Sequence, residues 1–243
     1  MNGILSRSGM AIAVGVLAIA IAVSGCDAGA DSIREASMVE TNPPDWYRGG
    51  QSALRYQTDR ARGRLWALTP EGIEVYEATT RQKVAQIALP GWTWVGRQYA
   101  CPPDLAIGPR GEAVVSSNIV PTLWRVDPVT LVASKHDLAV DEDKGRDIGF
   151  TALAYSAQQG AYFAVSSSHG SLWRIDPLFT RAQSIPLSAP LPRACGLAIP
   201  PREPAQRTSG VIGFCVRGVQ RDWTISLAPD QRSGYVRPGQ CMG

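Results

Sequence analysis

Short apolar segments follow one another along the chain and are interrupted by polar turn residues. The segments are rich in Val, Ile, Thr and aromatic residues, and the 24 Gly and 18 Pro of the 243-residue sequence are distributed between them. β-Branched and aromatic side chains favour strands, whereas Gly and Pro favour turns. The pattern therefore predicts an all-β fold of many short strands and disfavours long helices.

One phrase occurs twice: LWRVDPVT begins at Leu123, and LWRIDPLF begins 49 residues later at Leu172. Related segments begin 50 residues earlier, at Ile73, and 51 residues later, at Trp223. A second marker, found as LAIGP, LAYSA and LAIPP, follows the same period. A period of about 40 to 50 residues built from short strands indicates a β-propeller, in which each repeat is one four-stranded blade.

Each of the four repeats divides into four short strands separated by turns. The strands of the second repeat are expected at 104–108, 112–116, 122–126 and 131–137, and those of the third at 151–156, 161–165, 171–175 and 181–187. The first repeat gives 52–57, 64–68, 72–76 and 83–89, and the fourth gives 196–199, 210–217, 222–227 and 234–237. We predict a β-propeller-like domain of about four blades over residues 51–243; a partial propeller arc and a β-sandwich are the alternatives.

In both copies of the phrase the third strand ends at an Asp-Pro turn, Asp127-Pro128 and Asp176-Pro177. Asp suits the first turn position, and Pro, which lacks an N–H, stops the strand. This turn is similar to that of the bacterial surface-protein and quinoprotein-like propellers, and the resemblance implies their architecture. Glu77 replaces the aspartate in the first repeat, and the fourth repeat carries only an out-of-register Ala-Pro-Asp. Such propellers usually close with more blades than the four counted here.

The N-terminus has the three parts of an export signal: positive charge at Arg7, a 14-residue apolar run over 10–23, and Val23-Ser24-Gly25-Cys26. The run is shorter than the about 20 residues that span a bilayer. The segment resembles the lipobox of bacterial lipoproteins, which implies cleavage before Cys26 and acylation of its sulfur. An ordinary secretory signal is the alternative.

The lipobox resemblance also implies a location. Asp27 follows the lipid-bearing cysteine, as in lipoproteins that stay in the inner membrane and face the periplasm. We therefore expect a signal peptide over residues 1–25, a flexible lipid-anchored tether over 26–50, and a bilayer as the first partner. The tether is rich in Ala, Ser, Asp and Glu and would span some tens of ångströms.

Four further cysteines remain in the sequence: Cys101, Cys195, Cys215 and Cys241. An even number in an exported chain indicates two disulfides, for which three connectivities exist. We favour a Cys195–Cys215 pair, because both residues are expected near the same end of one hairpin. A free or metal-bound cysteine is the less favoured alternative, and no C-x-x-C motif is present.

The charges and motifs indicate few kinds of chemistry. With 24 basic and 21 acidic residues and no long basic run, nucleic acid is not an expected partner. The sequence lacks H-E-x-x-H, G-x-S-x-G and nucleotide-binding fingerprints, and its two histidines, His136 and His169, do not cluster. Among the expected starts of the inner strands only Asp104 is a carboxylate. We therefore assign no catalytic residue, metal ligand or cofactor.

Two connections between blades contain residues that could bind a partner or an ion. The first, over 89–104, contains Trp92, Trp94 and Tyr99. Aromatic residues at this density suit a binding surface, although packing over the end of the propeller explains them as well. The second, Asp141 to Asp147, alternates acidic residues but places Gly145 at a ligand position, so a solvated turn is favoured over a calcium loop.

The sequence thus favours a membrane-anchored lipoprotein whose propeller is a non-enzymatic binding or scaffold module for an unidentified periplasmic or membrane protein. The competing hypothesis is a quinoprotein- or lactonase-like propeller enzyme, or a sensor of a small ligand. Fold alone does not decide between them.

Overall fold

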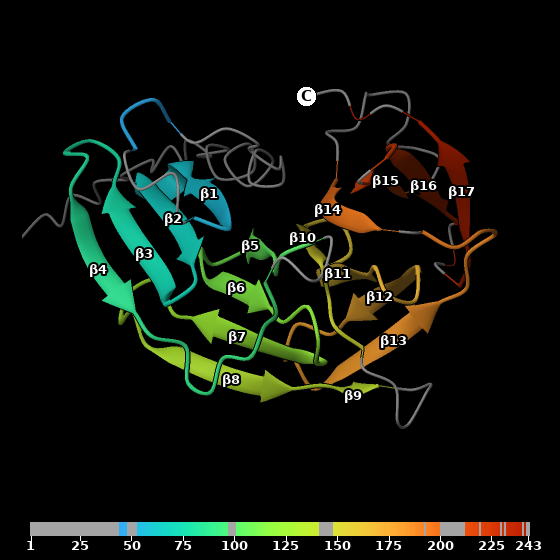
Figure 1. Cartoon of the computed structure of the whole chain (residues 1–243), viewed down its shortest axis with the longest axis horizontal. Coiled ribbons are helices and arrows are strands. Elements are labelled where there is room, and N and C mark those ends of the chain that lie inside the picture. The colour runs from blue at the N-terminus through green and yellow to red at the C-terminus, as the bar shows by residue number, and fades with distance from the viewer. Residues whose placement is uncertain are drawn as a thin grey trace, which may run out of the picture.

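The computed structural model describes residues 44–47, 53–96, 101–140, 148–191, 193–199, 212–218, 220–228, 230, 232–239 and 241. Four antiparallel sheets follow one another along the chain, and we call them blades 1 to 4 (Figure 1). Blade 1 contains β1 (Arg55–Asp59), η1 (Arg60–Arg62), β2 (Arg64–Thr69), β3 (Gly72–Glu77) and β4 (Lys83–Ile87). Blade 2 contains β5 (Leu105–Ile107), β6 (Ala113–Ser116), β7 (Thr122–Val126) and β8 (Ala133–Asp137).

Blade 3 contains β10 (Ala152–Ser156), β11 (Ala161–Ser166), β12 (Ser171–Ile175) and β13 (Arg181–Ile185). Blade 4 contains β14 (Ala194–Ala198), β15 (Ile212–Gly218), β16 (Trp223–Leu227) and β17 (Gly234–Pro238). The four inner strands β1, β5, β10 and β14 lie toward the middle, and β4, β8, β13 and β17 lie at the periphery (Figure 1). This arrangement is that of propeller blades and not of two stacked sheets, so the prediction of an all-β, four-bladed fold is confirmed.

The predicted strand positions agree closely with the structure. The third strands of blades 2 and 3 coincide with the two copies of the repeated phrase at Thr122–Val126 and Ser171–Ile175. The largest shift is in blade 1, whose inner strand begins at Arg55 and not at residue 52.

The core consists of layers between neighbouring blades, because each strand presents alternate side chains to opposite faces. On β7, Trp124 belongs to the cluster shared with blade 1, and Leu123 belongs to the cluster shared with blade 3. Both side chains are fully buried. A third layer joins blades 3 and 4 and includes Phe163 and Phe214, whose ring centroids are 4.8 Å apart.

The two outer faces of the row of blades differ. Leu65 and Ala67 of blade 1 are covered by Trp46 and Tyr47, which come from the segment before the first strand. On the corresponding face of blade 4, Ser226 and its cross-strand neighbour Tyr235 are exposed, and Cys215 is buried in its disulfide with Cys241. The aromatic cover described for blade 1 therefore has no counterpart among the described residues of blade 4.

The edges of the outer strands of blades 3 and 4 are covered by the connection that arrives from the preceding blade. The short strand β9 (Ala139–Val140) runs parallel to β13, and Leu187 forms a parallel bridge to Gly234 of β17. These contacts pair part of each edge and leave less of it open to pairing with another chain.

The Asp-Pro turns form as predicted. Asp127 Oδ1 accepts hydrogen bonds from the N–H groups of Val129 and Thr130, at 2.9 and 2.8 Å. The bond from Thr130 is the main cause of the lowered pKa of Asp127. The Asp176 carboxylate accepts similar bonds from the N–H groups of Leu178 and Thr180, both at 2.9 Å. The repeated phrase therefore has a structural role, since it closes the third strand of a blade.

Candidate functional site

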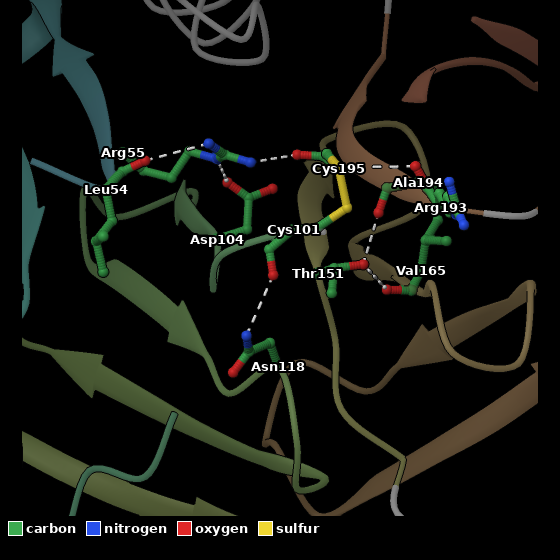
Figure 2. Close-up of a disulfide and its surroundings, with 10 residues drawn as sticks. All are labelled: Leu54, Arg55, Cys101, Asp104, Asn118, Thr151, Val165, Arg193, Ala194 and Cys195. Atoms are coloured by element: carbon green, nitrogen blue, oxygen red, sulfur yellow. Dashed lines mark hydrogen bonds and ion pairs between the residues drawn. A yellow bond between two sulfur atoms is a disulfide. The ribbon is translucent and has the colours of Figure 1, made fainter. Parts of the chain in front are cut away.

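An ion pair links the inner strands at the centre of the propeller. Nε of Arg55, at the start of β1, lies 3.3 Å from Oδ1 of Asp104, the residue before β5 (Figure 2). The Arg55 guanidinium also donates to the carbonyl of Leu54, at 3.1 Å, and to the carbonyl of Cys195 on β14. Asp104 is 2% exposed. This one arginine thus contacts blades 1, 2 and 4.

The Asp104 carboxylate connects a third neighbour. Its Oδ2 accepts the N–H of Leu153 on β10 at 2.7 Å, and its Oδ1 accepts the N–H of Leu105 at 2.9 Å. Burial raises the pKa of the Asp104 carboxyl, and the Arg55 guanidinium and the two N–H groups oppose this rise without cancelling it. Because both oxygens are engaged, the carboxylate holds the inner strands of blades 1, 2 and 3 together.

A disulfide between Cys101 and Cys195 crosses the same region and joins blade 2 to blade 4 (Figure 2). Cys101 is fully buried, and its carbonyl accepts a hydrogen bond of 3.1 Å from Nδ2 of Asn118. Beside it, Oγ1 of Thr151 donates to the carbonyl of Ala194 at 2.6 Å, which joins blades 3 and 4. The centre is therefore a set of contacts between blades.

The second disulfide joins Cys215 and Cys241. Two disulfides among the four predicted cysteines are confirmed, but the favoured Cys195–Cys215 pair is wrong. Cys215 stands opposite Ala198 in the β14–β15 ladder, whereas Cys195 lies at a register shift three residues away. Three residues of strand cover about 10 Å, which exceeds the Cα separation that a disulfide can bridge.

The aromatic loop, which we define as residues 89–96, packs on the turn between β6 and β7. The rings of Trp92 and Trp94 stack with centroids 5.6 Å apart and an interplanar angle of 24°. Trp92 packs against the core layer between blades 1 and 2, and both tryptophans remain partly exposed. Tyr99, the third predicted member, lies outside the described residues.

Polar side chains of the β6–β7 turn fix the backbone of this loop. Asn118 bonds both the N–H and the carbonyl of Val95, at 3.0 and 2.8 Å. Oγ of Ser117 donates to the carbonyl of Thr93, and Nε1 of Trp124 donates to the carbonyl of Pro90. These bonds fix the backbone that carries the two stacked tryptophans.

The remaining candidates stay apart. His136 lies on β8, where burial, together with the nearby Arg125, lowers its pKa, and His169 lies in the turn between β11 and β12. In the described part of the chain, no three His, Cys, Asp or Glu side chains gather as metal ligands. The same residues contain no helix with the length and apolarity to cross a membrane. Cys26 and the loop from Asp141 to Asp147 lie outside them.

Sequence reasoning missed two functional groups of this region. It placed Asp104 at the start of an inner strand but did not find Arg55, because their partnership spans 49 residues and has no local motif. It found the tryptophans but not Asn118, which is an ordinary turn residue until its contacts are seen.

No protein-family model and no curated protein sequence matches this chain. Solved structures match it in fold. The WD40 repeats of RRP9 superpose with a TM-score of 0.50 at 10% identity, covering 77% of this chain and 51% of that one. An auxiliary nutrient binding protein from Bacteroides thetaiotaomicron gives 0.52 at 8% identity, over 79% and 43% of the two chains. The GH74 xyloglucanase from Xanthomonas campestris gives 0.51 at 15% identity, over 84% and 32%.

The shared fold is a propeller. WD40 repeats form propeller blades, which agrees with the four sheets seen here. The chain spans about half or less of the length of these three structures. At such low identities the similarity shows the fold alone, and the proteins that share it include a binding protein and an enzyme.

Proposed function

We propose that this chain is a lipid-anchored protein of the bacterial envelope whose propeller serves as a non-enzymatic binding or scaffold module. Cys26 would carry the lipid, and the domain would face the periplasm from the inner membrane. Its partner would be a periplasmic or membrane protein. The lipobox resemblance and Asp27 support the anchor and the location.

The fixed and partly exposed aromatic pair is the observation that carries the proposed binding function. Tryptophans with a rigid backbone lose little conformational entropy on binding, and Trp is among the residues that contribute most to protein interfaces. Ser117 and Asn118 supply that rigidity. The loop therefore has the properties of a preorganised contact surface.

The centre of the propeller supports the same proposal. Arg55 and Asp104 bond each other across blades, and they also bond Cys195 of blade 4 and Leu153 of blade 3. A catalytic pair at this position would have to break contacts that hold the inner strands together. These ionisable groups are thus better suited to stability than to turnover.

The test is photocrosslinking in living cells, with the crosslinker placed at Thr93 in the exposed part of the aromatic loop. We expect one membrane or periplasmic protein to be captured, and we expect the purified partner to bind the full chain about tenfold more weakly after Trp94→Ala. Tyr235→Ala, which removes another exposed aromatic ring in blade 4, is the matched control and should bind normally. Separation of the two membranes locates the anchored chain.

Unchanged affinity in the Trp94→Ala variant would show that the loop only packs against the propeller. A cofactor, metal or small ligand that remains bound in native mass spectrometry of the purified chain, together with turnover of a substrate, would favour the enzyme or sensor instead. Recovery of the chain in the outer-membrane fraction would contradict the proposed location.

A further inference from the structure

The two ends of the propeller present different surfaces. Because the strands of a blade are antiparallel, the turn from first to second strand and the turn from third to fourth lie at one end, which we call the turn face. The opposite end, the loop face, carries the aromatic loop and the Cys101–Cys195 disulfide. On the turn face, Arg64 of blade 1 donates to the carbonyl of Pro128, and the Tyr162 hydroxyl of blade 3 donates to Glu112 of blade 2 at 3.3 Å. These contacts join the turns of blades 1, 2 and 3 into one continuous surface.

Two apolar side chains project from equivalent positions of this surface. Val129 is 84% exposed and Leu178 is 75% exposed, the highest values among the large apolar side chains of the described residues. Each is the second residue after the aspartate of an Asp-Pro turn, and that aspartate accepts its N–H at 2.9 Å. The turn backbone is therefore fixed in a conformation that holds the side chain outward.

On the turn face of blades 1 to 3, acidic and basic side chains differ in how far they are exposed. In the turns of blades 1 to 3, all described acidic side chains are buried or half-buried: Asp59, Glu77, Glu112, Asp127 and Asp176. The exposed charged side chains of the same turns are all basic: Arg60, Arg62, Arg81, Lys83, Arg110 and Arg181. The acidic groups accept hydrogen bonds within the turns, as Asp127 and Asp176 do. Arg62 and Arg110 pair with Asp59 and Glu112 of the same turns, at 3.2 and 3.7 Å, and Lys83 pairs with Glu74 at 3.1 Å. The described turn of blade 4 exposes both Asp230 and Arg232. In blades 1 to 3 the outermost charges are therefore basic, although the carboxylates beneath them balance part of this charge, and two apolar tips project among them.

Basic side chains around exposed apolar ones are the combination that binds anionic lipid surfaces. Arginine and lysine are attracted to the negative headgroups, and apolar side chains enter the boundary between headgroups and acyl chains. We propose that the turn face lies against the anionic phospholipid surface of the membrane that holds the chain. This inference rests on the proposed anchor at Cys26, and it turns the aromatic loop toward the periplasm.

Twenty residues separate Cys26 from Trp46, which packs on blade 1. The tether that the sequence predicts would span about 25 Å at this length, and such an anchor would keep the domain close to the bilayer.

The test is hydrogen exchange of the full chain in vesicles of phosphatidylethanolamine with about one third phosphatidylglycerol, compared with vesicles of phosphatidylcholine. We expect amides of residues 127–132 and 176–180 to exchange about fivefold more slowly on the anionic vesicles, with the difference shrinking at high salt. The double variant Val129→Asp, Leu178→Asp should abolish this protection. The control Ser168→Asp, Gln220→Asp adds two charges to turns of the loop face and should retain it.

Equal exchange on both vesicle types overturns the inference, as does protection of residues 117–121 on the loop face. Protection that appears only in native membranes, and not on the lipid vesicles, would assign the turn face to an acidic protein and refute the lipid as its partner. The mass of the N-terminal peptide separates the two proposals: an acylated chain without protection refutes the membrane contact alone. If the chain is not acylated, the proposed anchor fails, and flotation with anionic vesicles tests the membrane contact by itself. Binding that is lost in the Val129→Asp, Leu178→Asp variant supports a lipid contact of the turn face. Absence of binding by the wild-type chain refutes that contact.

Discussion

The disulfide between blades 2 and 4 should contribute more to stability than the one within the C-terminal region. The Cys101–Cys195 bond closes a loop of 94 residues, and the Cys215–Cys241 bond closes one of 26. In the chain-entropy treatment the destabilisation of the unfolded state grows with the logarithm of loop length, which gives about 4.7 kcal/mol for the first bond and about 3.5 kcal/mol for the second. The difference of about 1 kcal/mol is large enough to measure.

The assay compares two double variants, Cys101→Ala, Cys195→Ala and Cys215→Ala, Cys241→Ala, by urea denaturation with the wild-type chain. Each variant removes two sulfur atoms, so the pair controls for the loss of packing. We expect the first variant to unfold at the lower urea concentration. Loss of the Cys101–Cys195 bond also releases the segment that leads into β5 and contains Asp104, and this should lower the stability of the first variant further. Equal midpoints, or a lower midpoint for the second variant, would falsify the assignment of the larger stabilisation to the central bond.

Two further changes test the contacts around the centre and the aromatic loop. Because the pKa of Asp104 is raised in the folded chain, the native state holds the Asp104 proton more tightly than the unfolded state does. Protonation of Asp104 therefore contributes its full stabilisation below the ordinary carboxyl pKa, and this stabilisation is lost as pH rises through the raised pKa. Arg55→Met removes a group that lowers this pKa, so we expect a loss of stability near pH 7 that narrows toward about pH 4.5 in urea denaturation; a loss independent of pH would contradict the ion pair. Gly149→Ala would place a Cβ 1.9 Å from a backbone carbon of Asn118 and should cost about 1–3 kcal/mol, with altered tryptophan fluorescence. Gly213→Ala, whose added Cβ would meet no atom of the described residues within 4 Å, should change stability by less than about 0.5 kcal/mol. Equal effects in the two variants would refute the close contact at Gly149.

The blades could be predicted because each is a local unit. Thr122–Val126 and the strands beside it are neighbours in sequence. The apolar spacing and the Asp-Pro turn that determine them lie within a few residues of one another. The repeat period of about 50 residues then gives the positions of the other blades along the sequence. Strand identity and order therefore follow from information that is short in range.

The contacts between blades could not be predicted in the same way. Arg55 meets Cys195 across 140 residues, and Cys101 meets Cys195 across 94. Which residues face the centre depends on how strongly each strand twists and where its register shifts, as at Ala194 and Gly196. The favoured cysteine pair was wrong for this reason, since sequence proximity within a hairpin does not give the register of its ladder.

The order in which the four cysteines pair has a consequence for how the chain matures. Cys101 bonds the next cysteine along the chain, Cys195, and Cys215 bonds the next, Cys241. In the proposed export, the N-terminal side of the chain would meet the oxidant first, so each bond would form as soon as its second cysteine had crossed the membrane. Pairing in order along the chain would then give the observed connectivity directly, with Cys101 bonded to Cys195 and Cys215 to Cys241.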